Sequence, residues 1–274
     1  VLSLEQTLEP DPGIQDVQVR LPRPFANADW TQTGGSATKA MHHLAIGAAP
    51  SRRWRANIGA GSSRERRLTA SPVVGGGRIF AMDANGLVVA HDMQTGKRLW
   101  RFDVVPKGER RGALGGGLAI AGDTLFVTSG YGDVITLAVS NGAEIWRTPL
   151  KIPLASPPTV AGGLMFVVTN DNQTFGLRAE DGAAVWNHVG IAETAGLVGA
   201  GSPAAADGVV VVPYSSGELV ALRANNGEVL WTDNLSRGGP TTALGEITDI
   251  NGHPVVDRGT VYAVGHSGRM VAND

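Results

Sequence analysis

Residues 226–231 read Asn-Gly-Glu-Val-Leu-Trp, and a phrase of the same form occurs three times earlier in the chain, at residues 95–100, 141–146 and 181–186. Each phrase places Gly four residues before Trp. The four closing tryptophans are 46, 40 and 45 positions apart. Self-similarity at a near-constant period of this length is the signature of stacked supersecondary units. The phrase therefore predicts a repeat architecture.

Each phrase closes a unit of four short β-rich runs joined by tight turns. In the first unit the runs 71–74, 78–82 and 87–91 are separated by glycine-bearing turns and are followed by the run that ends in Trp100. Short runs with turns of this kind are typical of an antiparallel meander. Four-stranded meanders repeated at this length, with one Trp each, are typical of the blades of a β-propeller.

We therefore predict an all-β fold, a propeller of four-stranded antiparallel blades, over residues 52–274. The chain covers about four and a half blades, near 68–105, 113–150, 155–190 and 200–235, with an incomplete one at 252–274. The tryptophans are predicted to be structural, each packed between neighbouring blades, and truncating one should cost about 3–5 kcal/mol. They are Trp54, Trp100, Trp146, Trp186 and Trp231.

The first part of the chain reads differently. Residues 1–51 contain repeated prolines and a Gly34-Gly35 break without a helix or strand period, so we expect an extended tail and linker. The run 52–58 around Trp54 predicts a strand outside the regular units. Because an open propeller exposes the apolar faces of its end blades, we expect this strand to close a last blade. The chain would then be the N-terminal part of a longer propeller.

Composition excludes several classes of function. The net charge is −2 and charged residues make up 18%, so no global charge favours nucleic acid. The chain has no Cys, which excludes disulfides, thiolate metal sites and cysteine nucleophiles. No apolar run approaches the roughly 20 residues of a membrane helix. The chain begins at Val1, so we expect that a leader was removed or the chain was trimmed.

Residues 221–231 resemble the repeat of quinoprotein-like propellers, in which Thr-Gly or Asn-Gly precedes a Trp strand. Two families share this repeat, the pyrroloquinoline-quinone (PQQ) dehydrogenases and the BamB-type outer-membrane assembly lipoproteins. The chain is more similar to the second, from about residue 50 to 274. That resemblance implies an eight-bladed, non-catalytic periplasmic scaffold at the outer membrane, held by a lipid anchor upstream of Val1, that aids assembly of β-barrel proteins.

The same resemblance implies a partner and a binding rim. In that family one rim of the propeller contacts the periplasmic repeats of the barrel-assembly protein. The matching positions here are Leu197 and Asp249, and the segment 246–256 resembles the family's acidic loop. Two positions depart from the pattern, because Val198 stands where a basic residue is expected and Asn251 where a second acid is expected. A buried turn residue is the alternative interpretation of Leu197.

An enzyme remains the alternative function. A quinone dehydrogenase, as the resemblance implies, holds its cofactor with a Trp floor, a calcium ion and usually two adjacent cysteines. This chain has no Cys and no Walker, H-E-x-x-H or G-x-S-x-G motif. The six histidines are scattered along the chain, which favours packing or surface roles over metal binding. We therefore predict no catalytic residue, no metal ligand and no cofactor.

A local basic cluster precedes the first blade. It consists of Arg52, Arg53, Arg55, Arg64, Arg66 and Arg67, with only Glu65 to balance it. One interpretation is a patch that faces an acidic partner or a phospholipid head-group surface, and the other, which we favour, is a solvated linker. Without interleaved aromatic residues the cluster gives no support to nucleic-acid binding.

Overall fold

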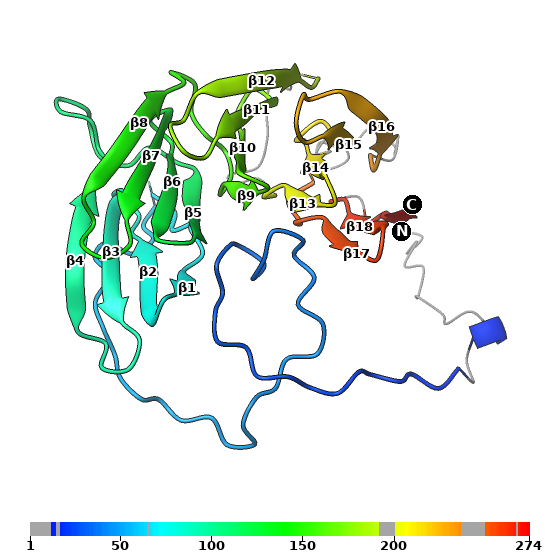
Figure 1. The fold of residues 1–274 in the computed structure, drawn as a ribbon, viewed down its shortest axis with the longest axis horizontal. Coiled ribbons are helices and arrows are strands. Elements are labelled where there is room, and N and C mark those ends of the chain that lie inside the picture. The colour runs from blue at the N-terminus through cyan, green and yellow to red at the C-terminus, as the bar shows by residue number, and fades with distance from the viewer. Residues whose placement is uncertain (1–11, 15–16, 65, 192–200, 237–249, 267) are drawn as a thin grey trace, which may run out of the picture.

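The computed structural model describes residues 12–14, 17–64, 66–191, 201–236, 250–266 and 268–274. In these ranges nineteen strands form five separate sheets, each an antiparallel meander whose strand order follows the chain. Figure 1 shows the sheets fanned along an arc about a shared axis. The prediction of an all-β propeller is confirmed, and each sheet is a blade.

The first three blades each contain four strands. Blade 1 contains β1 (Val73–Gly75), β2 (Arg78–Met82), β3 (Leu87–Asp92) and β4 (Arg98–Asp103). Blade 2 contains β5 (Gly116–Ala121), β6 (Thr124–Ser129), β7 (Asp133–Ala138) and β8 (Glu144–Pro149). Blade 3 contains β9 (Thr159–Ala161), β10 (Leu164–Val168), β11 (Gln173–Arg178) and β12 (Ala184–Val189).

Blade 4 repeats the pattern and blade 5 has three strands in the described residues. Blade 4 contains β13 (Ala204–Ala206), β14 (Val209–Pro213), β15 (Glu218–Arg223) and β16 (Val229–Asn234). Blade 5 contains β17 (Val255–Asp257), β18 (Thr260–Val264) and β19 (Met270–Asn273). One short 3-10 helix, η1 (Pro12–Ile14), lies near the N-terminus. No helix in the described residues has the length and apolar character needed to cross a membrane.

The sequence of each strand matches its depth in the blade. The second and third strands are apolar runs buried on both faces, as in the four consecutive valines of β14, because a neighbouring blade covers each side. The outer strands β4, β8, β12 and β16 expose most of their residues but turn a tryptophan inward. Each joins its neighbour through a register shift at the same place, such as Ala90/His91 in blade 1. Such bulges increase local twist.

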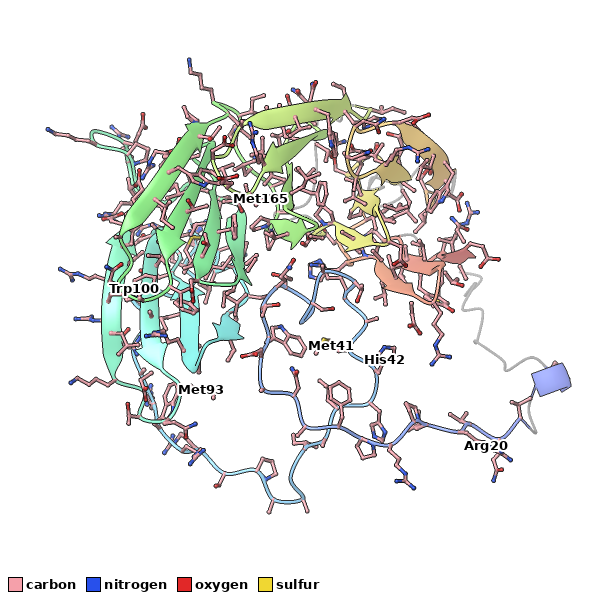
Figure 2. The ribbon with its side chains drawn as sticks, in the orientation of Figure 1. Arg20, Met41, His42, Met93, Trp100 and Met165 are labelled. Atoms are coloured by element: carbon pink, nitrogen blue, oxygen red, sulfur yellow. The ribbon has the colours of Figure 1, made fainter. Side chains whose placement is uncertain are left out.

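The core consists of apolar layers between successive blades. One buried cluster joins blades 1 and 2, and similar clusters join blades 2 and 3, 3 and 4, and 4 and 5. In the first, Phe80 of β2 packs on Trp100 with ring centroids 5.6 Å apart. Figure 2 shows Trp100 within this layer. The packing role predicted for the tryptophans holds for Trp100 and Trp186, which are 9% and 8% exposed.

Residues 52–58 are not assigned as a strand and pair with none of the strands in the described residues. Their expected pairing in a last blade stays a prediction, because that blade is not among the five sheets. Trp54 is nevertheless placed like the other tryptophans. Its indole N–H donates to the Met93 carbonyl oxygen at 3.0 Å, and its ring packs on Gly96.

The N-terminal segment enters the centre of the fan. Residues 25–45 form a loop whose two ends pair, because Phe25 N–H donates to the His43 carbonyl oxygen and Ala45 N–H to the Phe25 carbonyl oxygen, at 3.1 and 2.7 Å. Figures 1 and 2 show this axial loop, with Met41 and His42, inside the arc of inner strands.

The axial loop contacts the innermost strand of every sheet in the described residues. Trp30 exchanges two backbone hydrogen bonds with Val74 in β1, and the Thr31 carbonyl accepts one from Ile120 in β5. The side chain of Gln32 bonds both backbone groups of Val160 in β9, at 2.8 and 3.1 Å. The Ala37 and Thr38 carbonyls accept hydrogen bonds from Ala205 in β13 and Val256 in β17, both at 2.9 Å. Part of the segment expected to be a tail is therefore a structural element of the propeller axis.

Candidate functional site

The two rims of the propeller differ in the connections that form them. After each of the first four outer strands the chain donates a backbone hydrogen bond to the turn between the second and third strands of its blade, as Gly190 does to Asn172 at 2.9 Å. The connections between blades and these turns therefore share one rim, the loop rim. The opposite rim, the turn rim, carries the tight turns 75–78 and 92–97 of blade 1 and their equivalents.

Three of the four predicted partner-binding residues, Leu197, Val198 and Asp249, lie outside the described residues, in the chain segments that follow β12 and β16. Asn251 is described and is exposed. Its neighbour Ile250 is 2% exposed, and its N–H donates to the Tyr214 carbonyl oxygen at 3.3 Å. The side chain of Asn251 is therefore presented to solvent from a buried anchor.

The two connections re-enter the fold side by side. Gly201 follows the segment that contains Leu197, and a Cβ at this position would lie 2.5 Å from the Gly252 carbonyl oxygen and 3.1 Å from that of Ile250. One residue further on, Ser202 N–H donates to His253 Nδ1 at 2.8 Å. Only glycine allows this approach, so blades 4 and 5 bring together the chain positions that follow Leu197 and Asp249.

A buried polar platform supports this part of the rim. The hydroxyl of Tyr214, a fully buried side chain, lies 2.7 Å from Thr174 Oγ1 and 2.9 Å from His188 Nδ1. Burial raises the pKa of Tyr214 and lowers that of His188, so both side chains are neutral at pH 7. The Tyr214 hydroxyl is sealed from solvent and satisfied on both sides, so this group positions the rim and does not meet a substrate.

Two polar groups fix the chain just before the Leu197 connection. The side chain of Glu218 accepts a hydrogen bond from Ile191 N–H at 3.0 Å. Asn172 Nδ2 donates to the Ile191 carbonyl oxygen at 2.6 Å, and Asn172 Oδ1 accepts from Ser215 N–H at 3.2 Å. Asn172 has a positive φ of 59°, the left-handed conformation that Asn tolerates better than most residues. The connection therefore leaves the blade from a fixed point.

A buried amine lies below the rim, on the axis. Lys39 of the axial loop places Nζ 3.2 Å from Thr159 Oγ1, and that hydroxyl lies 2.9 Å from Ser202 Oγ. Burial lowers the pKa of Lys39 to about 7. Burial, with the nearby Lys39 charge, lowers the pKa of His253 to about 4. This cluster was not predictable from the sequence, in which only the Gly34-Gly35 break marks the segment as unusual.

The histidines and carboxylates of the described residues do not form a metal-ligand cluster, because no three of their side chains are grouped. The histidine pair is divided, because His43 Nδ1 lies 2.7 Å from the Pro22 carbonyl oxygen whereas His42 Nε2 lies 3.8 Å from Asp257. The loop rim presents the exposed amide of Asn251, and the connections after β12 and β16 begin and end on rigid blades. Loops held by a rigid scaffold in this way are suited to protein recognition.

Comparison with known proteins identifies the family. The family model described as outer membrane protein assembly factor BamB matches residues 84–274. The chain belongs to this family. It is 29% identical over 119 residues to the BamB of Moranella endobia (strain PCIT) and 30% identical over 126 residues to that of Nitrosomonas eutropha. The matches cover 43% and 42% of this chain but 31% and 28% of the relatives, so the chain spans about a third of their length.

Solved structures agree on the fold. The crystal structure of BamB from Moraxella catarrhalis matches with a TM-score of 0.66 at 22% identity, over 79% of this chain and 64% of that one. A europium-containing methanol dehydrogenase matches with a TM-score of 0.70 at 13% identity, over 89% of this chain and 56% of that one. At these identities the likeness shows the propeller fold and not an activity.

Proposed function

We propose that this BamB-family chain is a non-catalytic periplasmic scaffold that aids assembly of β-barrel proteins into the outer membrane. It binds the periplasmic repeats of the barrel-assembly protein through the loop rim of blades 4 and 5. The observation that supports the proposal is the contact of Gly201 with Ile250 and Gly252, the described residues that follow Leu197 and Asp249 in the chain. Association with the membrane, through an anchor upstream of Val1, belongs to the same proposal.

The physical basis of the binding is a small anchor on a rigid support. Leu197 supplies apolar area, and Asp249 supplies a charge that a basic partner residue can pair with. The buried Tyr214 platform and the Gly201 contact fix the bases of both connections, which reduces the entropy that is lost on binding. Val198 and Asn251 sit where the family pattern expects charges, so we propose that apolar contact contributes more here than ion pairing.

The test is a binding assay between the 274-residue chain and the soluble periplasmic repeats of the barrel-assembly protein. We expect Asp249→Arg to raise the dissociation constant about tenfold or more, because it replaces an attractive charge with a repulsive one. The matched control is Asp123→Arg, which makes the same charge change at an exposed turn on the opposite rim. The control should change the dissociation constant by less than about twofold.

Three results would overturn the proposal. The unmodified chain could fail to bind the repeats, or the two variants could weaken binding equally. Alternatively, addition of PQQ and Ca²⁺ could produce a bound chromophore and dye reduction. That last result would identify the chain as a PQQ-dependent dehydrogenase, the alternative function.

A further inference from the structure

Charge is divided unevenly between two parts of the chain. Residues 52–111, which form blade 1 and the segment before it, contain thirteen Lys and Arg against five Asp and Glu, a net charge of +8. All other residues together contain ten Lys and Arg against twenty Asp and Glu, a net charge of −10. The overall charge of −2 hides this asymmetry. Blade 1 is a strongly basic end of an otherwise acidic molecule.

Two contacts of the segment 52–67 gather these charges on one blade. At the turn rim, the Trp54 indole bonds the Met93 carbonyl oxygen, which sets the neighbouring arginines beside the turn that leads into β4. At the loop rim, Arg66 bonds the Asn85 side chain. The Arg66 side chain also packs against Gly112, so closely that a Cβ on Gly112 would lie 3.2 Å from it. The segment thus carries its positive charge along blade 1 from one rim to the other.

The resulting basic belt is exposed. It consists of Arg52, Arg53, Arg55, Arg64, Arg67, Lys97, Arg98, Arg101, Lys107 and Arg110. Figure 2 shows side chains with nitrogen at their tips projecting from the outer edge of blade 1. Among the described residues none of these ten side chains lies within 4 Å of a carboxylate. The belt therefore presents its charge to solvent.

Three acidic residues of blade 1 are engaged elsewhere. Asp83 is buried, and its carboxylate accepts hydrogen bonds from the backbone N–H groups of Ala60, Asn85 and Leu87. The Asp92 carboxylate bonds within its own turn. Asp103 pairs with Arg111, which is outside the belt. Glu109 is exposed beside Arg110 and forms no ion pair within 4 Å in the described residues. The ten positive charges of the belt therefore outnumber the carboxylates that face solvent beside them.

The composition of the belt matches an array of phosphates. Eight of the ten side chains are arginines, whose planar guanidinium groups bind phosphate oxygens bidentately. Two leucines stand among them, Leu68 at 40% exposure and Leu99 at 44%. Exposed apolar side chains beside arginines suit the boundary between head groups and acyl chains. The aromatic residues described in blade 1 are buried or half-buried, so none is offered for stacking on bases or for anchoring in a protein pocket.

We infer that the basic belt docks blade 1 on an anionic phospholipid surface. The acidic remainder of the molecule is repelled by such a surface, so the charge asymmetry also orients the propeller with blade 1 toward the membrane. This inference does not depend on the loop-rim partner, because the belt lies on blade 1 whereas the rim site lies between blades 4 and 5.

The test is flotation of the 274-residue chain with vesicles. We expect binding to vesicles of phosphatidylglycerol and phosphatidylethanolamine, at about three parts to seven, and none to phosphatidylcholine vesicles. The belt variant is Arg53→Gln, Arg101→Gln and Arg110→Gln, three exposed side chains in no ion pair. It should bind the anionic vesicles roughly 100-fold more weakly, since each basic residue near such a surface contributes about 1 kcal/mol, or about a fivefold factor.

The matched control removes the same charge from the acidic part of the molecule, at the exposed residues Arg20, Lys151 and Arg258, each changed to Gln. It should bind vesicles as the unmodified chain does, and circular dichroism should show both triple variants folded. Equal loss in the two triple variants would overturn the inference, because net charge alone would then explain binding. Failure of the unmodified chain to bind anionic vesicles would overturn the inference too. So would binding of the unmodified chain to a DNA fragment but not to the vesicles.

Discussion

At the scale of single residues, the repeated phrase serves two interfaces at once. Its Trp packs toward the following blade, whereas its Gly receives the Trp of the preceding one. The ring of Trp100 lies on Gly142 and that of Trp186 on Gly227, and each of these indoles donates to a carbonyl oxygen in the same turn. A Cβ on Gly142 would lie 2.6 Å from the indole, which is closer than side chains approach. Glycine is thus required by both the turn and the neighbouring ring.

This double requirement predicts a large effect of Gly142→Ala. The residue has φ of +74°, and its Cβ would collide with Trp100. The two effects together should lower the free energy of unfolding by about 2–4 kcal/mol in chemical denaturation. Gly208→Ala is the matched control, because its φ is +78° but a Cβ there meets nothing within 4 Å, so it should cost only about 1 kcal/mol. Equal losses would show that the indole contact contributes nothing.

The sequence predicted the tryptophans and their packing role but not their partners. The period reveals which residues are equivalent, yet Trp100 meets a glycine 42 positions later, and such a distant contact leaves no local pattern. The same limit applies to residues 52–58. Trp54 contacts the Gly96 turn of blade 1 as Trp100 contacts the Gly142 turn of blade 2, but no strand partner of this segment is among the described residues.

At the scale of elements, the axial loop was not predictable from the sequence. It binds the inner strands chiefly through backbone groups, which any residue supplies, and its residues show neither a 2-residue nor a 3.6-residue period. The loop also satisfies the free edges of the five innermost strands, which would otherwise present unpaired backbone groups at the axis. It therefore acts as a common edge partner for five blades, and the adjacent inner strands lie close enough to share it.

Gln32 provides a test of this element. Its side chain bonds both the carbonyl oxygen and the N–H of Val160, and it is 5% exposed. Gln32→Leu would leave two buried backbone groups without partners, so the free energy of unfolding should fall by about 2–4 kcal/mol. Gln94→Leu, at an exposed side chain, should change it by less than about 0.5 kcal/mol. If Gln32→Leu were as mild as its control, the loop would not be a stabilising element of the axis.

At the scale of the whole molecule, the fold was easier to predict from the sequence than the function. The blade period determined the architecture, because it reports equal units that must stack. The proposed binding site is predicted less completely, since Leu197, Val198 and Asp249 come from the resemblance alone and lie outside the described residues. What the structure adds is the junction of Gly201 with Ile250 and Gly252, which no sequence period could reveal.

The axis also couples the stability of the whole propeller to pH. Lys39 lies where the inner strands converge, and burial lowers its pKa from 10.5 to about 7. In the unfolded chain the amine regains its ordinary pKa, so between pH 7 and 10.5 the unfolded state binds more protons. The native state is therefore favoured as pH rises through this window, and the advantage is lost as pH falls toward 7.

We expect the free energy of unfolding to rise by roughly 2 kcal/mol between about pH 7 and pH 9, measured by denaturant titration. Lys39→Met should remove this rise and should stabilise the protein at pH 7, because it no longer buries an amine that has to lose a proton or its hydration. Lys107→Met, at an exposed side chain, should keep the slope of the unmodified chain. If the free energy of unfolding still rose with pH in Lys39→Met, other titrating groups would be the cause of the rise. If Lys39→Met were less stable than the unmodified chain at pH 7, the bond from Lys39 Nζ to Thr159 would outweigh the cost of burying the amine.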